Sequence, residues 1–217
     1  MPLDPSQRFP VMCLTQDGTG IGHGAQAARL CAAGARWVQL RMKDADDETR
    51  LREARLAVQA CHRHGAVLIV NDRVDIAVAA GADGVHLGSQ DGAWTDARRR
   101  LGEAAILGGT VNNAADAGRA VACGVLDYAG VGPLRHTATK RNLSPVLGIE
   151  GIRALIGILG EIPAWVIGGV RAEDLAAAVA AGAAGVAVSS PLHAHGRIEE
   201  NLRAFLEAGR AATPITP

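Results

Sequence analysis

A short pattern recurs four times along this chain and constrains its fold more than any other feature. Each copy is an alanine-rich stretch, then a glycine, then a short apolar segment, and the glycines are Gly34, Gly81, Gly124 and Gly182. The pattern is typical of a helix that ends at a left-handed glycine and leads into a buried strand. Successive copies are about 40 to 60 residues apart, which leaves room for roughly two strand–helix units at a time.

The segments between the copies complete a regular alternation. The predicted strands are Val11–Thr15, Trp37–Arg41, Val67–Asn71, Gly84–Leu87, Ala105–Thr110, Tyr128–Val131, Ala164–Ile167 and Val186–Ser189. Helical segments lie between most of them, for example Gly24–Ala33, Asp47–His64, Asn113–Cys123, Gly148–Leu159 and Ala172–Ala181, with Ile198–Ala211 last. Strands alternating with helices indicate a parallel sheet. We therefore expect an α/β fold, a single (β/α)8 TIM barrel over residues 1–217 with its core at about 11–211. A doubly wound open sheet is the alternative.

Composition excludes several classes of function. The chain has 217 residues, of which 48% are hydrophobic, and its 22 basic and 22 acidic residues balance. Zero net charge and 3% aromatic residues disfavour nucleic acid and anionic membrane surfaces as partners. No apolar run reaches the roughly 18 residues of a membrane span, and residues 1–10 lack a signal-peptide pattern. We expect a cytoplasmic protein with small-molecule partners, and a homo-oligomer is left open.

The four cysteines, Cys13, Cys31, Cys61 and Cys123, lie in apolar stretches without CxxC spacing. This arrangement favours buried reduced thiols over a metal or disulfide site.

In a barrel, chemistry gathers where the strands end. At the end of the second strand, Gln39, Arg41 and Lys43 alternate with Leu40 and Met42. Alternate residues share a face, so the polar three should face the barrel mouth and the apolar two the helices. Two cations this close together favour an anion between them, such as a diphosphate. The alternative is a solvated strand end with scattered charge.

Carboxylates follow the next two strands. Asn71 and Asp72 end the third strand, and Asp91 lies just beyond the fourth. Beside a polyphosphate site, two carboxylates suggest Mg²⁺ held by oxygen ligands, with the phosphates completing its shell. An Asn-Asp pair could instead cap the following helix. His86 alternates in register with Gly84 and Gly88, so it should point inward, although a histidine in a strand is more often structural.

The remaining strand ends suggest a second anion site. Thr110 follows the fifth strand, and Thr137, Thr139 and Lys140 lie in the polar loop after the sixth. Gly168, Gly169 and Ser189 follow the last two strands, where barrels commonly bind phosphate through main-chain N–H groups. Two anion sites in one mouth would suit an enzyme that joins a diphosphate to a monophosphate. The polar loop could also be mere surface.

One further motif points elsewhere. Residues 20–25 read Gly-Ile-Gly-His-Gly-Ala, which satisfies the dinucleotide pattern G-x-G-x-x-A. The acidic residue expected at the end of the second strand is absent, because Gln39 and Arg41 occupy that end. We therefore do not expect this segment to bind a nucleotide.

Taken in order, the motifs resemble the thiamine phosphate synthase family. The matching pieces are Val38-Gln-Leu-Arg-Met-Lys43, Val70-Asn-Asp-Arg73, Ala82-Asp-Gly-Val-His-Leu-Gly88 with Asp91, Gly130-Val-Gly-Pro133, Thr137-Ala-Thr-Lys140 and Ile167-Gly-Gly169. The resemblance covers roughly Val11 to Ser190. It implies a transferase that joins hydroxymethylpyrimidine diphosphate to thiazole phosphate, with Mg²⁺ as cofactor and pyrophosphate as leaving group.

The resemblance also implies roles for individual residues. The pyrimidine diphosphate would be held by Gln39, Arg41, Lys43, Asn71, Thr110 and Lys140, with His86 among the substrate-binding residues. Mg²⁺ would be held by Asp72 and Asp91. The thiazole phosphate would be held by Thr137, Thr139, Gly169, Val188 and Ser189. Arg41, Lys43, Lys140 and Thr110 would be the catalytic residues, because they would stabilise charge on the leaving group.

Two departures and two alternatives accompany this resemblance. Thr110 keeps a hydroxyl where serine is usual in the family, and residues 134–136, Leu-Arg-His, replace a more apolar stretch. The sibling thiazole tautomerase shares the barrel, and His136 keeps that alternative open, although a tautomerase has no use for a diphosphate site. A non-catalytic regulator that binds thiamine phosphates is the other alternative, and the intact carboxylate pair argues against it.

Overall fold

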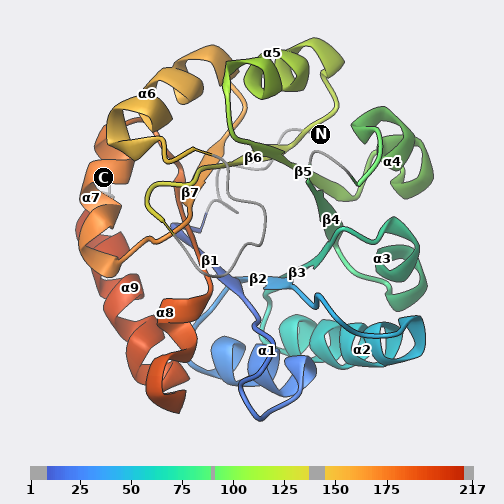
Figure 1. The fold of residues 1–217 in the computed structure, drawn as a ribbon. Helices are drawn as coiled ribbons and strands as arrows, with labels where there is room; N and C mark the ends of the chain where they lie inside the picture. Colours follow the sequence, from blue (N-terminus) through green and yellow to red (C-terminus); the bar gives the residue numbers. More distant parts are fainter. Residues whose placement is uncertain (1–8, 89–90, 137–144, 213–217) are drawn as a thin grey trace.

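The eight predicted strands close into one parallel barrel in the order β1 to β8, with β8 pairing back onto β1 (Figure 1). The computed structural model describes residues 9–88, 91–136 and 145–212. The single-barrel prediction is confirmed, and the open doubly wound alternative is wrong because no edge is left between β1 and β8. The predictions for Thr137, Thr139 and Lys140 fall outside the described residues.

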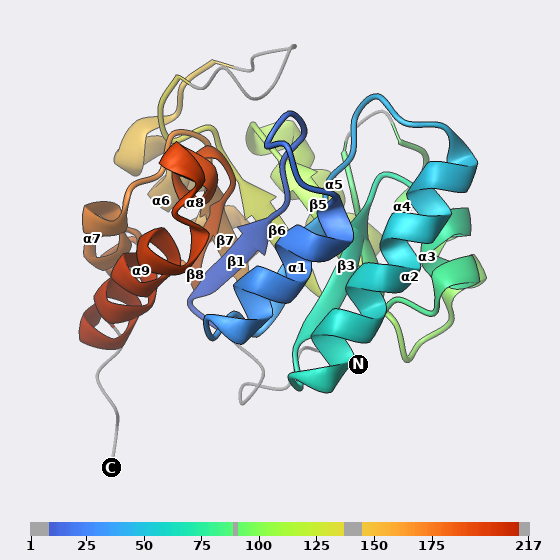
Figure 2. The same cartoon turned by 90° about the horizontal axis from the view of Figure 1, so that it is seen from below.

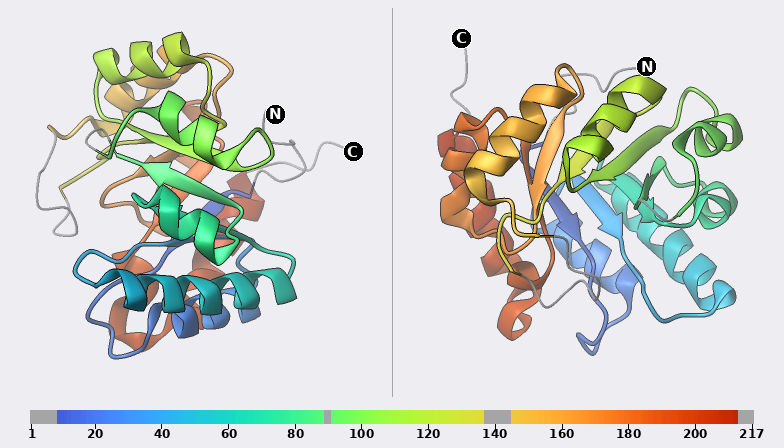
Figure 3. Two further views of the ribbon diagram at one scale, coloured as in Figure 1. Left: turned by 90° about the vertical axis from the view of Figure 1, so that its right-hand side faces the viewer. Right: turned by 45° about the horizontal axis from the view of Figure 1, so that its top comes forward.

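The strands are short and begin and end close to the predicted positions. They are β1 (Val11–Leu14), β2 (Trp37–Leu40), β3 (Val67–Asn71), β4 (Gly84–Leu87), β5 (Ile106–Val111), β6 (Tyr128–Val131), β7 (Ala164–Ile167) and β8 (Gly185–Val188). The helices are α1 (His23–Ala32), α2 (Asp47–Arg63), α3 (Val74–Ala80), α4 (Trp94–Leu101), α5 (Ala114–Cys123), α6 (Gly148–Leu159), α7 (Leu175–Ala180), α8 (Ser190–His193) and α9 (Ile198–Ala212), with short 3-10 turns η2 (Ala172–Asp174) and η3 (Ala194–Gly196). Figure 3 shows the helices surrounding the strands.

Alternation along each strand sorts its side chains into two cores. On β1, Val11 and Cys13 face outward into the layer between strands and helices, whereas Met12 and Leu14 face inward. The outer layer holds most of the buried valine, leucine and alanine side chains. The period of two in a parallel strand therefore determines which residues can reach the mouth of the barrel.

The glycines of the sequence repeat do what the pattern predicts. Gly34, Gly81, Gly124 and Gly182 all have positive φ, between 62° and 107°. Each allows the chain to reverse after a helix and enter the next strand. At the opposite end of a helix, the Asp46 side chain accepts a 2.7 Å hydrogen bond from Thr49 N–H and begins α2.

Three aromatic rings fill the interior of the barrel. Trp37, Tyr128 and Trp165 have no exposed surface, and their ring centroids lie 5.0 to 5.7 Å apart. Gly108 makes room for them, because a Cβ there would come within 2.1 Å of the Tyr128 ring. Edge-to-face packing of this kind makes the interior a solid core that closes the barrel beneath its mouth.

The cysteine prediction holds for three of the four thiols. Cys13, Cys31 and Cys61 are buried, Cys123 is half-buried, and all four are free. The sulfur atoms of Cys31 and Cys61 lie 3.6 Å apart across the α1–α2 contact. In the ranges that the structure covers, no helix is both long and apolar enough to cross a membrane.

Candidate active site at the barrel mouth

The connections that leave the strands gather at one end of the barrel, which we call the mouth. Figure 2 shows the β1–α1 and β2–α2 connections rising together at this end. Because all the strands are parallel, residues that follow different strands meet here even when they are far apart in sequence. The predicted site residues that the structure describes therefore lie at or near this one end of the barrel.

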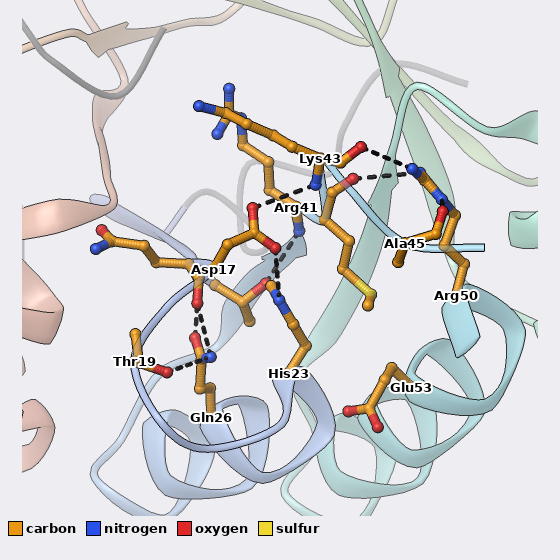
Figure 4. A network of polar contacts seen from close by, with 12 residues as sticks. Asp17, Thr19, His23, Gln26, Arg41, Lys43, Ala45, Arg50 and Glu53 are labelled. Atoms are coloured by element: carbon orange, nitrogen blue, oxygen red, sulfur yellow. Dashed lines mark hydrogen bonds and ion pairs between the residues drawn. The ribbon is translucent and has the colours of Figure 1, made fainter. Parts of the chain in front are cut away.

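Gln39, Arg41 and Lys43 lie at the end of β2 as predicted. Gln39 is 3% exposed, and its amide contacts Met12 Sδ at 3.6 Å inside the barrel. Leu40 belongs to the outer core and Met42 packs against it, which confirms the predicted alternation. Figure 4 shows the Arg41 and Lys43 side chains extending away from α1 and α2.

The environment of Arg41 contains charges of both signs. Burial lowers the pKa of its guanidinium, while the carboxylates of Asp72 and Asp17 act in the opposite direction. Arginine stays protonated over the whole physiological range. The mouth therefore holds a permanent, partly desolvated positive charge beside carboxylates.

The main chain that carries these cations is held by side chains. Arg50 on α2 donates to the carbonyl oxygens of Met42, Lys43 and Ala45 at 3.2, 2.8 and 2.9 Å (Figure 4). From the other side, Thr15 Oγ1 accepts from Arg41 N–H at 3.0 Å. The segment beyond β2 is thus fixed although no further strand bonds support it.

Asp72 and Asp91 come together from the ends of β3 and β4. Their carboxyls interact directly, and Asp91 Oδ2 also accepts from Gly88 N–H at 2.7 Å. Asp72 exposes part of its surface. Burial of the carboxyl, followed by the hydrogen bond and negative charge of Asp91, nevertheless raises its pKa to about 7, against the lowering effect of Arg41 and Arg50. Two carboxyl groups held this close make it unfavourable for both to be ionised at once.

Asp72 also has an unusual backbone conformation. Its φ is 66°, in the left-handed region, and its N–H donates to His86 O at 2.8 Å. Aspartate tolerates this region better than most residues, at some cost in strain. The observed conformation turns the side chain toward Asp91 immediately after the strand ends. Asn71, by the alternation of β3, shares the inward face of Ile69.

His86 links the aromatic core to the mouth. As predicted, it points inward, where Nδ1 lies 3.0 Å from Tyr128 Oη and Nε2 lies 2.9 Å from Thr110 Oγ1. Both ring nitrogens are engaged and the residue is 9% exposed. Thr110, at the end of β5, is half-buried. His86 is therefore placed to orient Thr110 from below.

The connections after β6, β7 and β8 form the opposite rim. Arg135 N–H donates to Gly168 O at 2.9 Å, and its guanidinium pairs with both oxygens of Asp174 at 2.5 and 2.6 Å. Gly169 has a φ of 66°, and a Cβ there would lie 2.9 Å from Arg135 Cβ. The Arg135 side chain thus ties the β6–α6 connection to the β7–α7 connection.

Ser189 and Val188, two predicted residues of this rim, differ in which of their groups could contact a ligand. Ser189 is half-buried, and its Oγ lies 3.4 Å from Gln16 Oε1. The side chain of Val188 is buried in the outer core, so that any ligand contact from this residue would come from its main chain.

Sequence reasoning missed four polar residues of the site: Thr15, Asp17, His23 and Arg50. Asp17 could have been found, because it follows β1 just as Asp72 and Asp91 follow β3 and β4. His23 lies inside the glycine motif of residues 20–25, and nothing in that motif marks its imidazole as a residue of the mouth. Within the described ranges, no group of three or more His, Cys, Asp or Glu side chains is arranged to hold a metal.

These features define the class of the protein: a (β/α)8-barrel enzyme with a mixed cationic and acidic mouth. The family model of thiamine monophosphate synthase matches residues 12–192, and the chain belongs to this family.

Similar proteins agree with this assignment. A thiamine-phosphate synthase of Bacteroides fragilis is 42% identical over 184 residues, covering 82% of this chain and 90% of its own. One of Myxococcus xanthus is 43% identical over 187 residues, covering 84% of this chain and 83% of its own. The solved structure of a thiamine phosphate pyrophosphorylase from Pyrococcus furiosus superposes with a TM-score of 0.86 at 24% identity, covering 97% of this chain and all of its own. That likeness concerns the fold.

Proposed function

We propose that the protein is a transferase of thiamine biosynthesis that joins hydroxymethylpyrimidine diphosphate to thiazole phosphate and releases pyrophosphate. Membership of the family supports the reaction. The observation that carries the proposal is the position of Arg41, with Lys43 on the same segment, beside Asp72 and its partner Asp91 at the mouth. A diphosphate needs this combination, whereas isomerisation of a thiazole phosphate does not.

The diphosphate would lie against the cationic side of the mouth. Arg41, Lys43 and Lys140 would supply positive charge, and Gln39, Asn71 and Thr110 would supply neutral hydrogen-bonding groups. Charge-assisted hydrogen bonds to phosphate oxygens are shorter and stronger than neutral ones. The partly buried Arg41 strengthens this effect, because water screens it less than a fully exposed cation.

Asp72 and Asp91 would hold a divalent cation between them. The two carboxyls lie close enough to interact, and carboxylate oxygens are ligands that Mg²⁺ prefers. Two protein carboxylates suit an ion whose remaining ligands are water and substrate phosphate. Bound there, Mg²⁺ would offset negative charge on the departing pyrophosphate.

The covalent change is a substitution at the pyrimidine methylene carbon. Its C–O bond to the diphosphate breaks, the aminopyrimidine stabilises the resulting cation, and the thiazole nitrogen then forms the new C–N bond. Arg41, Lys43 and Lys140 hold the leaving group while it gains charge, and Thr110 donates its hydroxyl proton in a hydrogen bond. The thiazole nitrogen supplies the bonding electron pair, so this route calls for no side-chain nucleophile, and placing the two substrates together supplies much of the rate.

The thiazole phosphate would occupy the opposite rim. Gly169 and the main chain of Val188 would present N–H groups, while Thr137, Thr139 and Ser189 would add hydroxyls. The Arg135–Asp174 ion pair supports this rim from outside by fixing the connection that carries Gly169. The two anions would thus be held on facing sides of one mouth.

A direct assay tests the proposal. Purified protein, hydroxymethylpyrimidine diphosphate, thiazole phosphate and Mg²⁺ are mixed, and thiamine phosphate is oxidised to its fluorescent thiochrome. We expect product that depends on Mg²⁺ and disappears with EDTA. No product from folded protein would contradict the proposal, and a tautomer-conversion assay on the thiazole phosphate would then test the tautomerase alternative.

A further inference from the structure

The pairing of β1 with β2 continues past the last strand residue through side chains. The last main-chain bond of the pair runs from Thr15 N–H to Gln39 O at 3.0 Å. Beyond it, Arg41 N–H donates to Thr15 Oγ1 at 3.0 Å and Lys43 N–H donates to Asp17 Oδ2 at 3.2 Å. Side-chain oxygens therefore take the place of carbonyls for two further rungs. These two rungs hold the two cations of the proposed diphosphate site.

His23 connects both rungs. It is the first residue of α1 and is 7% exposed. Its Nδ1 lies 2.7 Å from Thr15 Oγ1 and its Nε2 lies 3.2 Å from Asp17 Oδ1. Figure 4 shows the imidazole reaching up from α1 toward Asp17 beneath the Arg41–Lys43 segment.

The partners fix the direction of each hydrogen bond. A carboxylate only accepts, so His23 Nε2 carries the proton that is shared with Asp17. In the neutral ring Nδ1 then accepts, and the Thr15 hydroxyl donates to it while its oxygen accepts from Arg41 N–H. Burial lowers the pKa of His23, which favours this neutral form despite the opposing effect of Asp17.

The arrangement of hydroxyl, imidazole and carboxylate is not a nucleophilic triad. Thr15 has no exposed surface, and its oxygen already accepts the Arg41 N–H. The hydroxyl cannot reach a substrate in the mouth. The Thr15 oxygen instead accepts a hydrogen bond from the main chain just beyond β2.

We propose that Thr15, Asp17 and His23 are positioning residues that set the direction of Arg41 and Lys43 toward the diphosphate. The proposal rests on the function proposed above. Arg50 holds the carbonyls of the same segment from the α2 side, so the segment is clamped between two sets of side chains. If His23 is replaced, Arg50 still holds the carbonyl groups of the segment. The N–H groups of Arg41 and Lys43, however, lose their alignment. Both cations then shift relative to the phosphates.

Gln26, on α1, holds the loop between β1 and α1 in place. Gln26 has no exposed surface, and its amide bonds the main chain of Gln16 in both directions at 2.8 Å. It also donates to Thr19 Oγ1 at 2.9 Å and Ile21 O at 3.1 Å. The loop that carries Asp17 is therefore anchored independently of His23, and we expect it to keep its path when His23 is replaced.

The test compares His23→Ala with His62→Ala. His62 Nε2 also contacts a carboxylate, that of Asp83, at 3.1 Å, but at the opposite end of the barrel. We expect His23→Ala to lower kcat/KM for hydroxymethylpyrimidine diphosphate by about 10- to 100-fold, with weaker inhibition by inorganic pyrophosphate. The KM for thiazole phosphate and the activity of His62→Ala should stay within about twofold of wild type.

Two further variants keep the inference falsifiable if His23→Ala does not fold. Asp17 is exposed, so Asp17→Ala should fold and reproduce the selective loss. His23→Gln retains a donor for Asp17 and should recover part of the activity. Equal losses toward both substrates, or wild-type kinetics in His23→Ala or Asp17→Ala, would overturn the inference. An inactive wild-type protein would instead contradict the proposed function itself.

Discussion

Replacing Asp72 with asparagine should make the protein more stable and nearly inactive at once. Asparagine has almost the same shape and also tolerates the left-handed backbone seen at this position, where φ is 66°. The substitution removes one of the two carboxylates that face each other at the ends of β3 and β4. It therefore separates the electrostatic role of Asp72 from its place in the fold.

The sign of the stability effect follows from the pKa of Asp72, which is raised from 3.8 to about 7 in the folded protein. A raised folded-state pKa means that the stability contributed by the neutral carboxyl is fully present below pH 3.8 and is lost as pH rises through about 7. The stability of Asp72→Asn relative to wild type should thus increase across this pH window and stay constant above it. Because the site is partly open to solvent, we expect an advantage of about 1 kcal/mol, or about 3 °C in Tm.

Thermal unfolding at pH 4 and pH 8, with and without Mg²⁺, measures this effect, and the thiochrome assay measures turnover. We expect Mg²⁺ to raise the Tm of wild type more than that of Asp72→Asn, and turnover to fall on the order of a hundredfold or more. Asp96→Asn, on the exposed start of α4, is a control for loss of one surface charge. An Asp72→Asn protein that is less stable at pH 8, or fully active, would refute the reasoning.

Substitutions at three other positions test separate parts of the structure. Arg98→Met leaves the carboxylate of Asp127 buried without its 2.6 Å ion pair. The free energy of unfolding should fall by about 3–5 kcal/mol, and the Tm measured by calorimetry by about 10 °C. An unchanged Tm would contradict this. Arg135→Ala should raise the KM for thiazole phosphate and leave that for the pyrimidine substrate alone, as steady-state kinetics would show, whereas equal changes would argue against its role at one rim. Thr110→Val should reduce kcat about a hundredfold and Thr110→Ser should retain activity; equal rates for the two variants would rule out a role for the hydroxyl.

The barrel was predictable because its signals are local. Glycines such as Gly81 and Gly124 mark helix ends, and short apolar runs such as residues 67–70 are typical of buried strands. The alternation of Gln39, Arg41 and Lys43 with Leu40 and Met42 also follows from strand geometry alone. Such features need no knowledge of what lies across the barrel.

The supporting contacts could not be predicted in the same way. The side chains of Arg50 and His23 act on a main chain that lies on a different element, and nothing in their own sequence neighbourhood marks this. His86 was expected to point inward, but its two partners come from β5 and β6 and depend on barrel closure. Long-range pairings of this kind become visible only when the strands are placed side by side.

The aromatic core makes this barrel its own optical reporter. Trp37 and Trp165 account for two of the three tryptophans, and both are completely buried against Tyr128. Indole emission shifts to longer wavelength when water reaches the ring, so a blue-shifted spectrum should mark an intact interior. Substitutions around the rim should leave the emission colour unchanged while altering turnover. Fluorescence and turnover measured on one sample can then distinguish a folded but inactive variant from an unfolded one.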